Sequence, residues 1–373
     1  MMKQYFLDTA STTRPYKEVV DTVADVMYNH YGNPSSIHEL GQDAKNIIEN
    51  VRDQIAADIN CEPKNIIFLS GACEANSLAF TTSKRVFTTR LEHKSIEMLC
   101  KDVAYFNNDK YGNIILDNDT LYRLGEHNWL VSVHAANSEI GVTQDLESIS
   151  KFVHRYNNIF HNNIFHVDAT QLYPECRIDV KELGIDIMSV SAQKFHGPRG
   201  IGFLYCKDGI KLNPLIGGSQ EDGRRGGTYN TPAIAGMGKA LEINRGALHD
   251  YTNICTRFNR DELAAKILEI SGVHLNGPEL SANRLYNNIS IRIDGVKASD
   301  LVTLASMYGI YISAGSACSS GEAVPSSTLK AIGLTDEQAL STIRITVDET
   351  LNQHDISDIV KILKNLIERL RAS

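Results

Sequence analysis

The sequence predicts an α/β fold in which a mainly parallel sheet carries helices on both faces. Short apolar runs that suit buried strands alternate, through most of the chain, with stretches whose apolar residues repeat at helical spacing. Near residue 248 the pattern changes, and the remaining helices and strands indicate a smaller α+β domain. We therefore expect a large domain over residues 14–247 and a small domain formed by residues 1–13 and 248–373.

Composition and charge are those of an ordinary globular protein. Of the 373 residues, 42% are hydrophobic and 22% are charged, and the formal net charge is -8. The acidic balance argues against direct nucleic-acid binding, and no apolar stretch is long enough to span a membrane. The seven cysteines are scattered without a CxxC pair, which argues against zinc and disulfides and predicts a reducing, cytoplasmic setting.

The first long helix and the early strands are visible as apolar patterns. After Ser36, which can cap a helix, apolar residues from Ile37 to Ile55 fall at helical spacing. A further helix is expected over Asp145–Tyr156. Four short runs are expected to be buried strands: Asn65–Leu69, Val86–Thr89, Trp129–Val133 and Ile164–Val167.

Polar candidates follow these strands. His93 comes after the second strand, Asn137 after the third, and Asp168 and Gln171 after the fourth. Ligands of open α/β sheets bind beyond the carboxyl ends of the strands, so this placement predicts one shared site. Taken singly, each residue has a structural alternative, since a lone histidine is usually satisfied by its neighbours and an aspartate often caps a turn.

A fifth strand, over residues 185–190, leads to Lys194 at the same edge. A lysine there can lose its charge and attack a carbonyl, as Schiff-base chemistry requires, although it can also simply point into water. Lys194 and Asp168 together suit pyridoxal phosphate, because a carboxylate beside the ring nitrogen keeps it protonated. The strand–glycine–helix junction at Ser70–Asn76 offers backbone N–H groups for a phosphate.

The rest of the chain adds an anion-binding candidate and two residues of the small domain. The glycine- and arginine-rich stretch 217–228 is expected to be a loop that suits an anion or is only solvated. Cys318 lies among small residues, which favours a travelling nucleophile over an inert buried thiol. Arg344 is either a carboxylate clamp or a salt-bridged strand residue. The expected elements here are Asp250–Ile270, Ser299–Tyr308 and Asp355–Leu370 as helices, and 201–206, Asn288–Ile293 and Ile343–Val347 as strands.

Ten segments, in order, resemble the cysteine desulfurases, the NifS-like branch of the class V aminotransferases. They are FLDTASTT, YGNPSSIH, SGACEAN, EHKS, NSEIGVTQD, HVDATQ, SAQKFHGPRGIG, GGSQEDGRRGGT, SAGSACSS and STIRITV. The resemblance implies a fold type I homodimer that uses pyridoxal phosphate to convert L-cysteine to L-alanine. It also implies an enzyme persulfide that passes to a sulfur-acceptor protein for iron–sulfur clusters, thiolated tRNA or a cofactor.

The resemblance also implies a role for each matching residue. Lys194 would form the Schiff base, Cys318 would carry the persulfide, and His93 would stack on the ring and assist proton transfer. The other residues would hold the cofactor or the substrate. Asp168 would pair with the ring nitrogen, Gln171 would bond the ring hydroxyl, and the phosphate would be held by Ala72, Cys73, Ser191 and Gln193. Thr228 would reach the phosphate of the neighbouring subunit, and the substrate carboxylate would be bound by Asn137 and Arg344.

Two positions depart from the family pattern. Gln193 stands where the family usually has histidine, and it cannot titrate; Cys73 stands where threonine is usual, and it lacks the hydroxyl donor. Two other functions therefore stay open. One is a related enzyme acting on selenocysteine or cysteine sulfinate, and the other is a partner or scaffold without catalytic activity.

Overall fold

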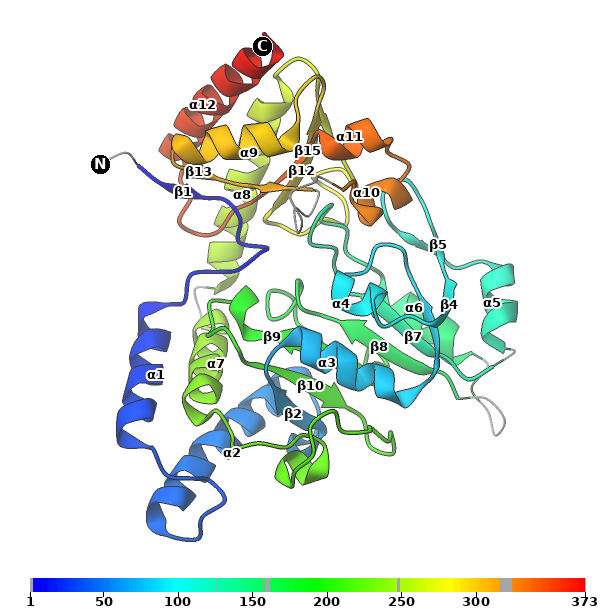
Figure 1. The fold of residues 1–373 in the computed structure, drawn as a ribbon, viewed down its shortest axis with the longest axis vertical. Coiled ribbons are helices and arrows are strands. Elements are labelled where there is room, and N and C mark those ends of the chain that lie inside the picture. Colours follow the sequence, from blue (N-terminus) through cyan, green and yellow to red (C-terminus); the bar gives the residue numbers. More distant parts are fainter. Residues whose placement is uncertain are drawn as a thin grey trace.

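The computed structural model describes residues 3–125, 127–155, 157, 162–246, 249–315 and 324–372. Figure 1 shows a larger block built on a wide sheet and, above it, a smaller block that contains both the first strand and the last helix. The predicted α/β fold is confirmed. The division at residues 14–247 stays a prediction.

A seven-stranded mixed sheet forms the centre of the larger block. Its edge strand β2 pairs with β10, which runs antiparallel to both of its neighbours, and all other adjacent pairs are parallel. In spatial order the strands are β2 (Ile66–Leu69), β10 (Gly202–Cys206), β9 (Ile187–Ser191), β8 (Ile164–Asp168), β7 (Leu130–His134), β3 (Arg85–Thr88) and β4 (Asp102–Tyr105). The carboxyl ends of β3, β7, β8 and β9 therefore meet at one edge.

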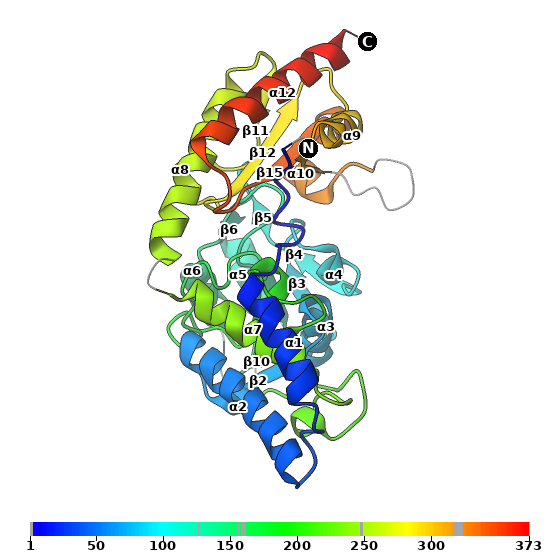
Figure 2. The ribbon, with the colours of Figure 1, turned by 90° about the vertical axis from the view of Figure 1, so that its left-hand side faces the viewer.

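Helices cover both faces of this sheet because its strands are apolar on both sides. In β2, Ile66 and Phe68 belong to one hydrophobic core, whereas Ile67 and Leu69 belong to another. The first core packs α2 (Glu39–Ile59), α6 (Leu146–His154) and α7 (Thr231–Asn244), and the second packs α3 (Ala72–Ala79). Helix α1 (Lys17–Asn29) lies against α7 on the outside, as Figure 2 shows.

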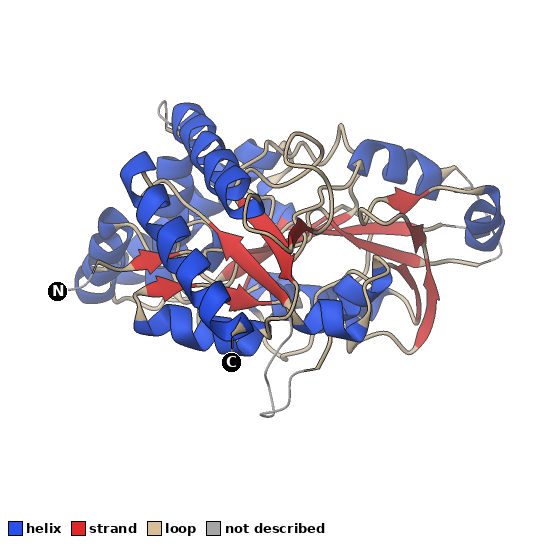
Figure 3. Cartoon of the chain, turned by 90° about the horizontal axis from the view of Figure 1, so that it is seen from above, coloured by secondary structure: helices blue, strands red, loops and turns tan. Residues whose placement is uncertain are grey.

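The smaller block has its own antiparallel sheet and its own core. In spatial order its strands are β11 (Val273–Leu275), β12 (Asn288–Ile293), β15 (Thr342–Thr346) and β14 (Ser313–Ala314). Its core packs these strands with α8 (His249–Leu268), α9 (Ala298–Met307) and α12 (Gln353–Arg371). Figure 3 shows the helices and strands of the molecule from above.

The start of the chain belongs to the smaller block. Strand β1 (Tyr5–Phe6) pairs in parallel with β13 (Ile310–Tyr311), and Asp8 forms an isolated bridge with Thr346 of β15. Residues 9–13 then cross to the larger block, where the N–H of Thr13 donates to the carbonyl of Gln193. One short segment thus links the two blocks beside the lysine-bearing turn.

Short elements complete the structure. They are the helices α4 (Lys94–Glu97), α5 (Asn118–Gly125), α10 (Ser327–Ala331) and α11 (Asp336–Leu340), the strands β5 (Asn107–Asn108) and β6 (Ile114–Ile115), and 3-10 turns at Pro63–Asn65, Phe80–Thr82, Ala192–Lys194 and Gln220–Gly223. Within the described part of the chain, no helix has both the length and the apolar character needed to cross a membrane.

Candidate active site

A cavity of about 740 Å³ lies between the carboxyl edge of the large sheet and the smaller block. Ten of the predicted site residues line it: Ala72, Cys73, His93, Asn137, Asp168, Gln171, Ser191, Gln193, Lys194 and Arg344. Thr228 lies elsewhere, and Cys318 falls outside the described residues. The structure therefore brings together residues from five different strand ends and from the sheet of the smaller block.

Lys194 ends the 3-10 turn that follows β9, and its amine is enclosed. Nζ donates to the carbonyl oxygens of Ala10 at 2.7 Å and Ser11 at 2.6 Å. Burial lowers the pKa of Lys194 to about 8, and the positive charge of Arg344 adds to this effect. A lysine of this kind loses its proton close to neutral pH, as a nucleophilic amine must.

Asp168 ends β8 as a buried carboxylate held by two hydrogen bonds. Oδ1 accepts from the N–H of Thr170 at 3.0 Å, and Oδ2 accepts from Nδ2 of Asn76 at 2.9 Å. Two residues earlier on the strand, His166 is fully buried between two serine hydroxyls, and burial lowers its pKa to about 4. His166 is therefore neutral at neutral pH and brings no positive charge to compete for Asp168.

The junction between β2 and α3 forms a cradle of donors. Gly71 precedes the helix with φ +147° and no side chain caps it, so the first helical N–H groups, those of Ala72 and Cys73 included, lack intrahelical acceptors. A Cβ at Gly71 would lie 3.4 Å from Oγ of Ser191. Glu74 Oε2 accepts from the N–H of Ser70 at 2.7 Å, so this carboxylate is already engaged. The arrangement suits a phosphate.

His93 and Asn137 are both tied to their own loops. His93 Nδ1 accepts from the N–H of Ser95 at 3.1 Å, which caps α4 and leaves Nε2 for the cavity. Asn137 Oδ1 accepts from the N–H groups of Glu139 and Ile140, and Nδ2 donates to the carbonyl of Leu91 at 2.8 Å. Asn137 thus shapes the loop after β7 and keeps one amide hydrogen for a ligand.

Arg344, on β15, points at the crossing segment. Nη2 donates to Oδ1 of Asp8 at 2.7 Å and to Oγ of Ser11 at 2.6 Å. Gln171 contacts the same segment, since its Nε2 donates to the carbonyl of Ala10 at 3.0 Å. In this structure, residues 8–11 thus engage Gln171, which is predicted to bind the ring hydroxyl, and Arg344, which is predicted to bind the substrate carboxylate.

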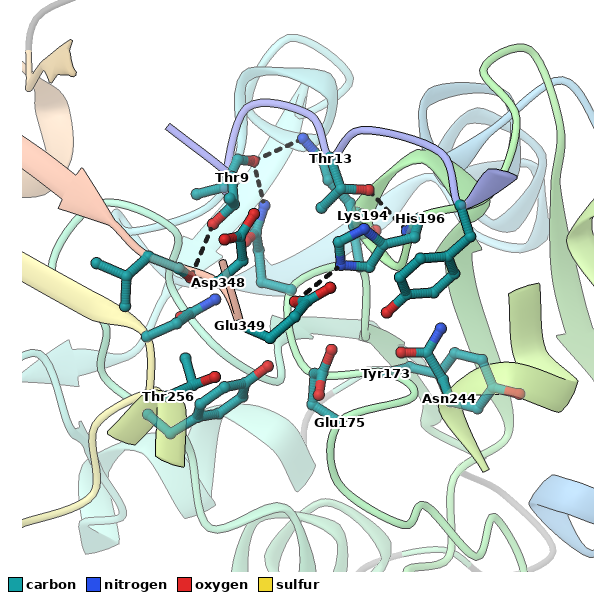
Figure 4. Close-up of a pocket in the computed structure, with 17 residues that line it drawn as sticks. Thr9, Thr13, Tyr173, Glu175, Lys194, His196, Asn244, Thr256, Asp348 and Glu349 are labelled. Atoms are coloured by element: carbon teal, nitrogen blue, oxygen red, sulfur yellow. Dashed lines mark hydrogen bonds and ion pairs between the residues drawn. The ribbon is translucent and has the colours of Figure 1, made fainter. Parts of the chain in front are cut away.

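A second cavity, of about 40 Å³, adjoins Lys194 and is shown in Figure 4. His196 lies there with φ +63° and stacks on Tyr16 at a ring distance of 4.2 Å. Its Nδ1 donates to the carbonyl of Arg14 at 2.9 Å, and its Nε2 lies 3.8 Å from Oε2 of Glu349 in the smaller block. These contacts fix the backbone directly after Lys194.

Thr228 is exposed on the glycine- and arginine-rich loop, beside a separate cavity of about 170 Å³. The loop is held against the rest of the chain by a buried ion pair between Arg52 Nη1 and Glu221 Oε2 at 2.9 Å, and by Arg225 Nε with Glu74 Oε1 at 3.1 Å. Thr228 thus lines a different cavity from the ones that Lys194 lines.

The residues that the sequence did not single out come from other parts of the chain. Asp8, Ala10 and Ser11 contact the predicted site, and Asn76 orients Asp168. Asn76 lay inside a quoted motif, but nothing in the sequence marked its role. Together, the amine of Lys194, the buried carboxylate of Asp168 and the phosphate cradle at the start of α3 fit pyridoxal phosphate. No cluster of potential metal ligands occurs among the described residues.

Comparisons with known proteins cover nearly the whole chain. The family model for aminotransferase class-V matches residues 5–359. Cysteine desulfurase IscS of Dictyoglomus turgidum is 36% identical over 389 residues, covering 100% of this chain and 96% of that protein. The structure of a NifS-like protein from Rickettsia africae gives a TM-score of 0.89 at 28% identity, covering 98% of this chain and 100% of that one. The structure of SspA in complex with cysteine gives 0.77 at 30% identity, covering 93% and 99%.

Proposed function

The chain belongs to the class-V aminotransferase family as a cysteine desulfurase, and we propose that it takes sulfur from L-cysteine with pyridoxal phosphate bound to Lys194. The observation that carries this proposal is the meeting of Lys194, Asp168 and Arg344 in one cavity. An amine with a lowered pKa, a buried carboxylate and a guanidinium are the groups that the cofactor and an amino acid require.

The residues of the cavity divide the work of holding the cofactor. Asp168 would pair with the ring nitrogen, and Gln171 would bond the ring hydroxyl. Ala72, Cys73 and Ser191 would hold the phosphate, with Gln193 beside them. When bound, the cofactor supplies an electron sink for the substrate carbon that bears the amino group. Because the backbone N–H of residue 73 is available whatever its side chain, Cys73 does not disable the cradle.

Proton transfer and substrate binding fall to residues around the cofactor. Lys194 would move a proton at the substrate Cα, because its pKa of about 8 lets it act both as acid and as base near neutral pH. His93 would present Nε2 for a second transfer. Arg344 would exchange Asp8 for the substrate carboxylate, and the remaining amide hydrogen of Asn137 would assist.

The sulfur transfer takes place between the thiol of Cys318 and the thiol of the substrate. The thiolate of Cys318 attacks the substrate sulfur, the Cβ–S bond breaks, and an S–S bond forms at Cys318. Cβ keeps the electron pair of the broken bond and takes a proton, which gives L-alanine. The proton lost by Cys318 balances the proton that Cβ gains.

The assembly and partners belong to the same proposal. We infer a homodimer in which Thr228 reaches the phosphate of the neighbouring subunit, since its loop is exposed and lies away from its own Lys194. We further propose a cytoplasmic protein whose persulfide passes to a sulfur-acceptor protein, such as an iron–sulfur scaffold or a tRNA-thiolation protein.

Two measurements test the proposed function. Borohydride reduction of protein incubated with pyridoxal phosphate should leave a pyridoxyl adduct on the Lys194 peptide, and the adduct should be missing in Lys194→Ala. Alanine release should then be measured with L-cysteine and with L-selenocysteine in the wild type and in Cys318→Ala. Loss of only the first activity in the variant supports a desulfurase, whereas retention of both contradicts it.

A further inference from the structure

Glu139 is a half-buried glutamate of the cavity to which the proposed function gives no task. It lies in the loop after β7, and its carboxyl group contacts two residues of the smaller block. Oγ of Ser326 donates to its Oε2 at 2.5 Å, and a Cβ built on Gly315 would lie 2.7 Å from its Oε1. Oε1 is buried and accepts no hydrogen bond from any described residue.

Gly315 and Ser326 lie on either side of the stretch that contains Cys318. Gly315 directly follows β14, and Ser326 is the N-cap of α10, where its hydroxyl accepts from the N–H of Leu329 at 3.4 Å. Figure 1 shows α10 at the lower edge of the smaller block, facing the larger block. One carboxyl group of the large block therefore touches both flanks of residues 316–323.

We propose that Glu139 is a positioning residue that holds Gly315 and Ser326, which lie on either side of Cys318 in the sequence, against the loop after β7. This inference rests on the proposed function only where it assigns the persulfide to Cys318. The contact between the two blocks is a property of the described residues alone.

The protonation of Glu139 supports this role. Burial raises the pKa of Glu139 to about 7, and the Ser326 hydrogen bond and the charge of Arg344 offset only part of that rise. Arg344, from β15 and itself paired with Asp8, is the charged group that faces it; α10 and the end of β14 contact it through neutral groups. If the blocks separate, water reaches the carboxyl group and its pKa falls back.

Linkage then gives the sign of the pH effect. The contact between Glu139 and the smaller block is strongest when Glu139 is protonated. It weakens as the pH rises from the ordinary glutamate pKa to about 7, and above about pH 7 it no longer changes with pH. If separation restores the ordinary value in full, the contact weakens up to about 30-fold between pH 5.5 and pH 8. A glutamine at this position keeps an oxygen for Ser326 and cannot ionise.

Hydrogen exchange in cofactor-free protein tests the contact without any activity. We would follow the peptide of residues 324–332 at pH 5.5 and 8, corrected for intrinsic rates, in wild type, Glu139→Gln, Glu139→Ala and Ser326→Ala. Glu337→Gln, an exposed glutamate of α11 in the same block, is the matched control. Protection should fall with pH in wild type and control, stay level in Glu139→Gln, and be low at both pH values in the other two variants.

The opposite pattern overturns the inference. If Glu139→Gln follows the pH dependence of the control, or if Glu139→Ala and Ser326→Ala leave protection unchanged, Glu139 does not hold the two blocks together. Since Glu139→Gln and Ser326→Ala are near-isosteric, the test stands even where Glu139→Ala does not fold.

Kinetics with L-cysteine separate this inference from the proposed function. Glu139→Ala and Ser326→Ala should lower kcat for alanine release at least several-fold and leave KM within about twofold, because Arg344 keeps its ion pair with Asp8. A wild type that releases no alanine refutes the proposed function, and the exchange data still decide on the contact. An active wild type with unchanged kcat in both variants refutes the positioning role alone.

Discussion

Replacing Arg344 with methionine should raise the pKa of Lys194 in the cofactor-free protein. Lys194 Nζ donates to the carbonyl of Ser11 and Arg344 Nη2 donates to its hydroxyl, so the two cations share one contact residue. Each cation lies 2.6 Å from an oxygen of Ser11. For an assumed charge separation of roughly 7 Å, Coulomb's law gives about 0.6–2.4 kcal/mol for effective dielectric constants from ~80 down to ~20. That energy corresponds to a rise of about half a pH unit to almost two. Asp8, left unpaired, would raise the pKa further.

Trace acetylation measures this pKa directly. Cofactor-free protein would be labelled with a small amount of acetic anhydride across a pH series, and the Lys194 peptide quantified by mass spectrometry. The wild-type midpoint should lie at about pH 8, and the midpoint of Arg344→Met should lie above it. Arg199→Met is the control, since Arg199 contacts the same segment at Thr12. A wild-type midpoint near 10.5, or a midpoint that Arg344→Met leaves unchanged or lowers, refutes the reasoning.

Two further predictions concern the scaffold of the site. Arg52→Met should lower the free energy of unfolding by about 3–5 kcal/mol because it leaves Glu221 buried and uncompensated; urea unfolding checks this, and adding Glu221→Gln should restore part of the loss. Gly71→Ala should cost about 1–2 kcal/mol and weaken pyridoxal phosphate binding in a fluorescence titration. Gly200 also has a positive φ but has open space around it, so Gly200→Ala should lower the free energy of unfolding by a similar amount and leave pyridoxal phosphate binding unchanged.

The strand-end residues were predictable because they obey a local rule. Asp168 directly follows a short apolar run, Lys194 follows another after one short turn, and a parallel sheet brings the ends of such runs together. The segment that contacts them was not predictable. Ala10 lies 184 residues before Lys194, and no local pattern links two such distant positions. Long-range contacts bring the start of the chain there, namely the pairing of β1 with β13 and the bridge between Asp8 and Thr346.

Among the elements that the sequence did not predict, α7 and β4 were missed for physical reasons. Helix α7 is buried on most sides, so it lacks the apolar stripe by which a helix is recognised. Strand β4 lies at the edge of the sheet and is only partly buried, so its apolar run is weak. Asn137 was predicted as a ligand, yet most of its hydrogen-bonding groups hold its own loop, which the residue type alone does not reveal.

If Arg344 holds the substrate carboxylate, as we propose, Asp8 competes with the substrate for it. Arg344 donates to the Asp8 carboxylate in this structure, so the amino acid would exchange one carboxylate for another. The exchange leaves no buried charge unpaired, because the guanidinium of Arg344 faces a carboxylate both before and after it. The exchange also changes the electrostatic potential at Lys194, since Asp8 raises the pKa of Lys194 and Arg344 lowers it. Asp8→Asn should therefore lower KM for L-cysteine, and a KM that rises in this variant would show that Asp8 orients Arg344 for the substrate instead of competing with it.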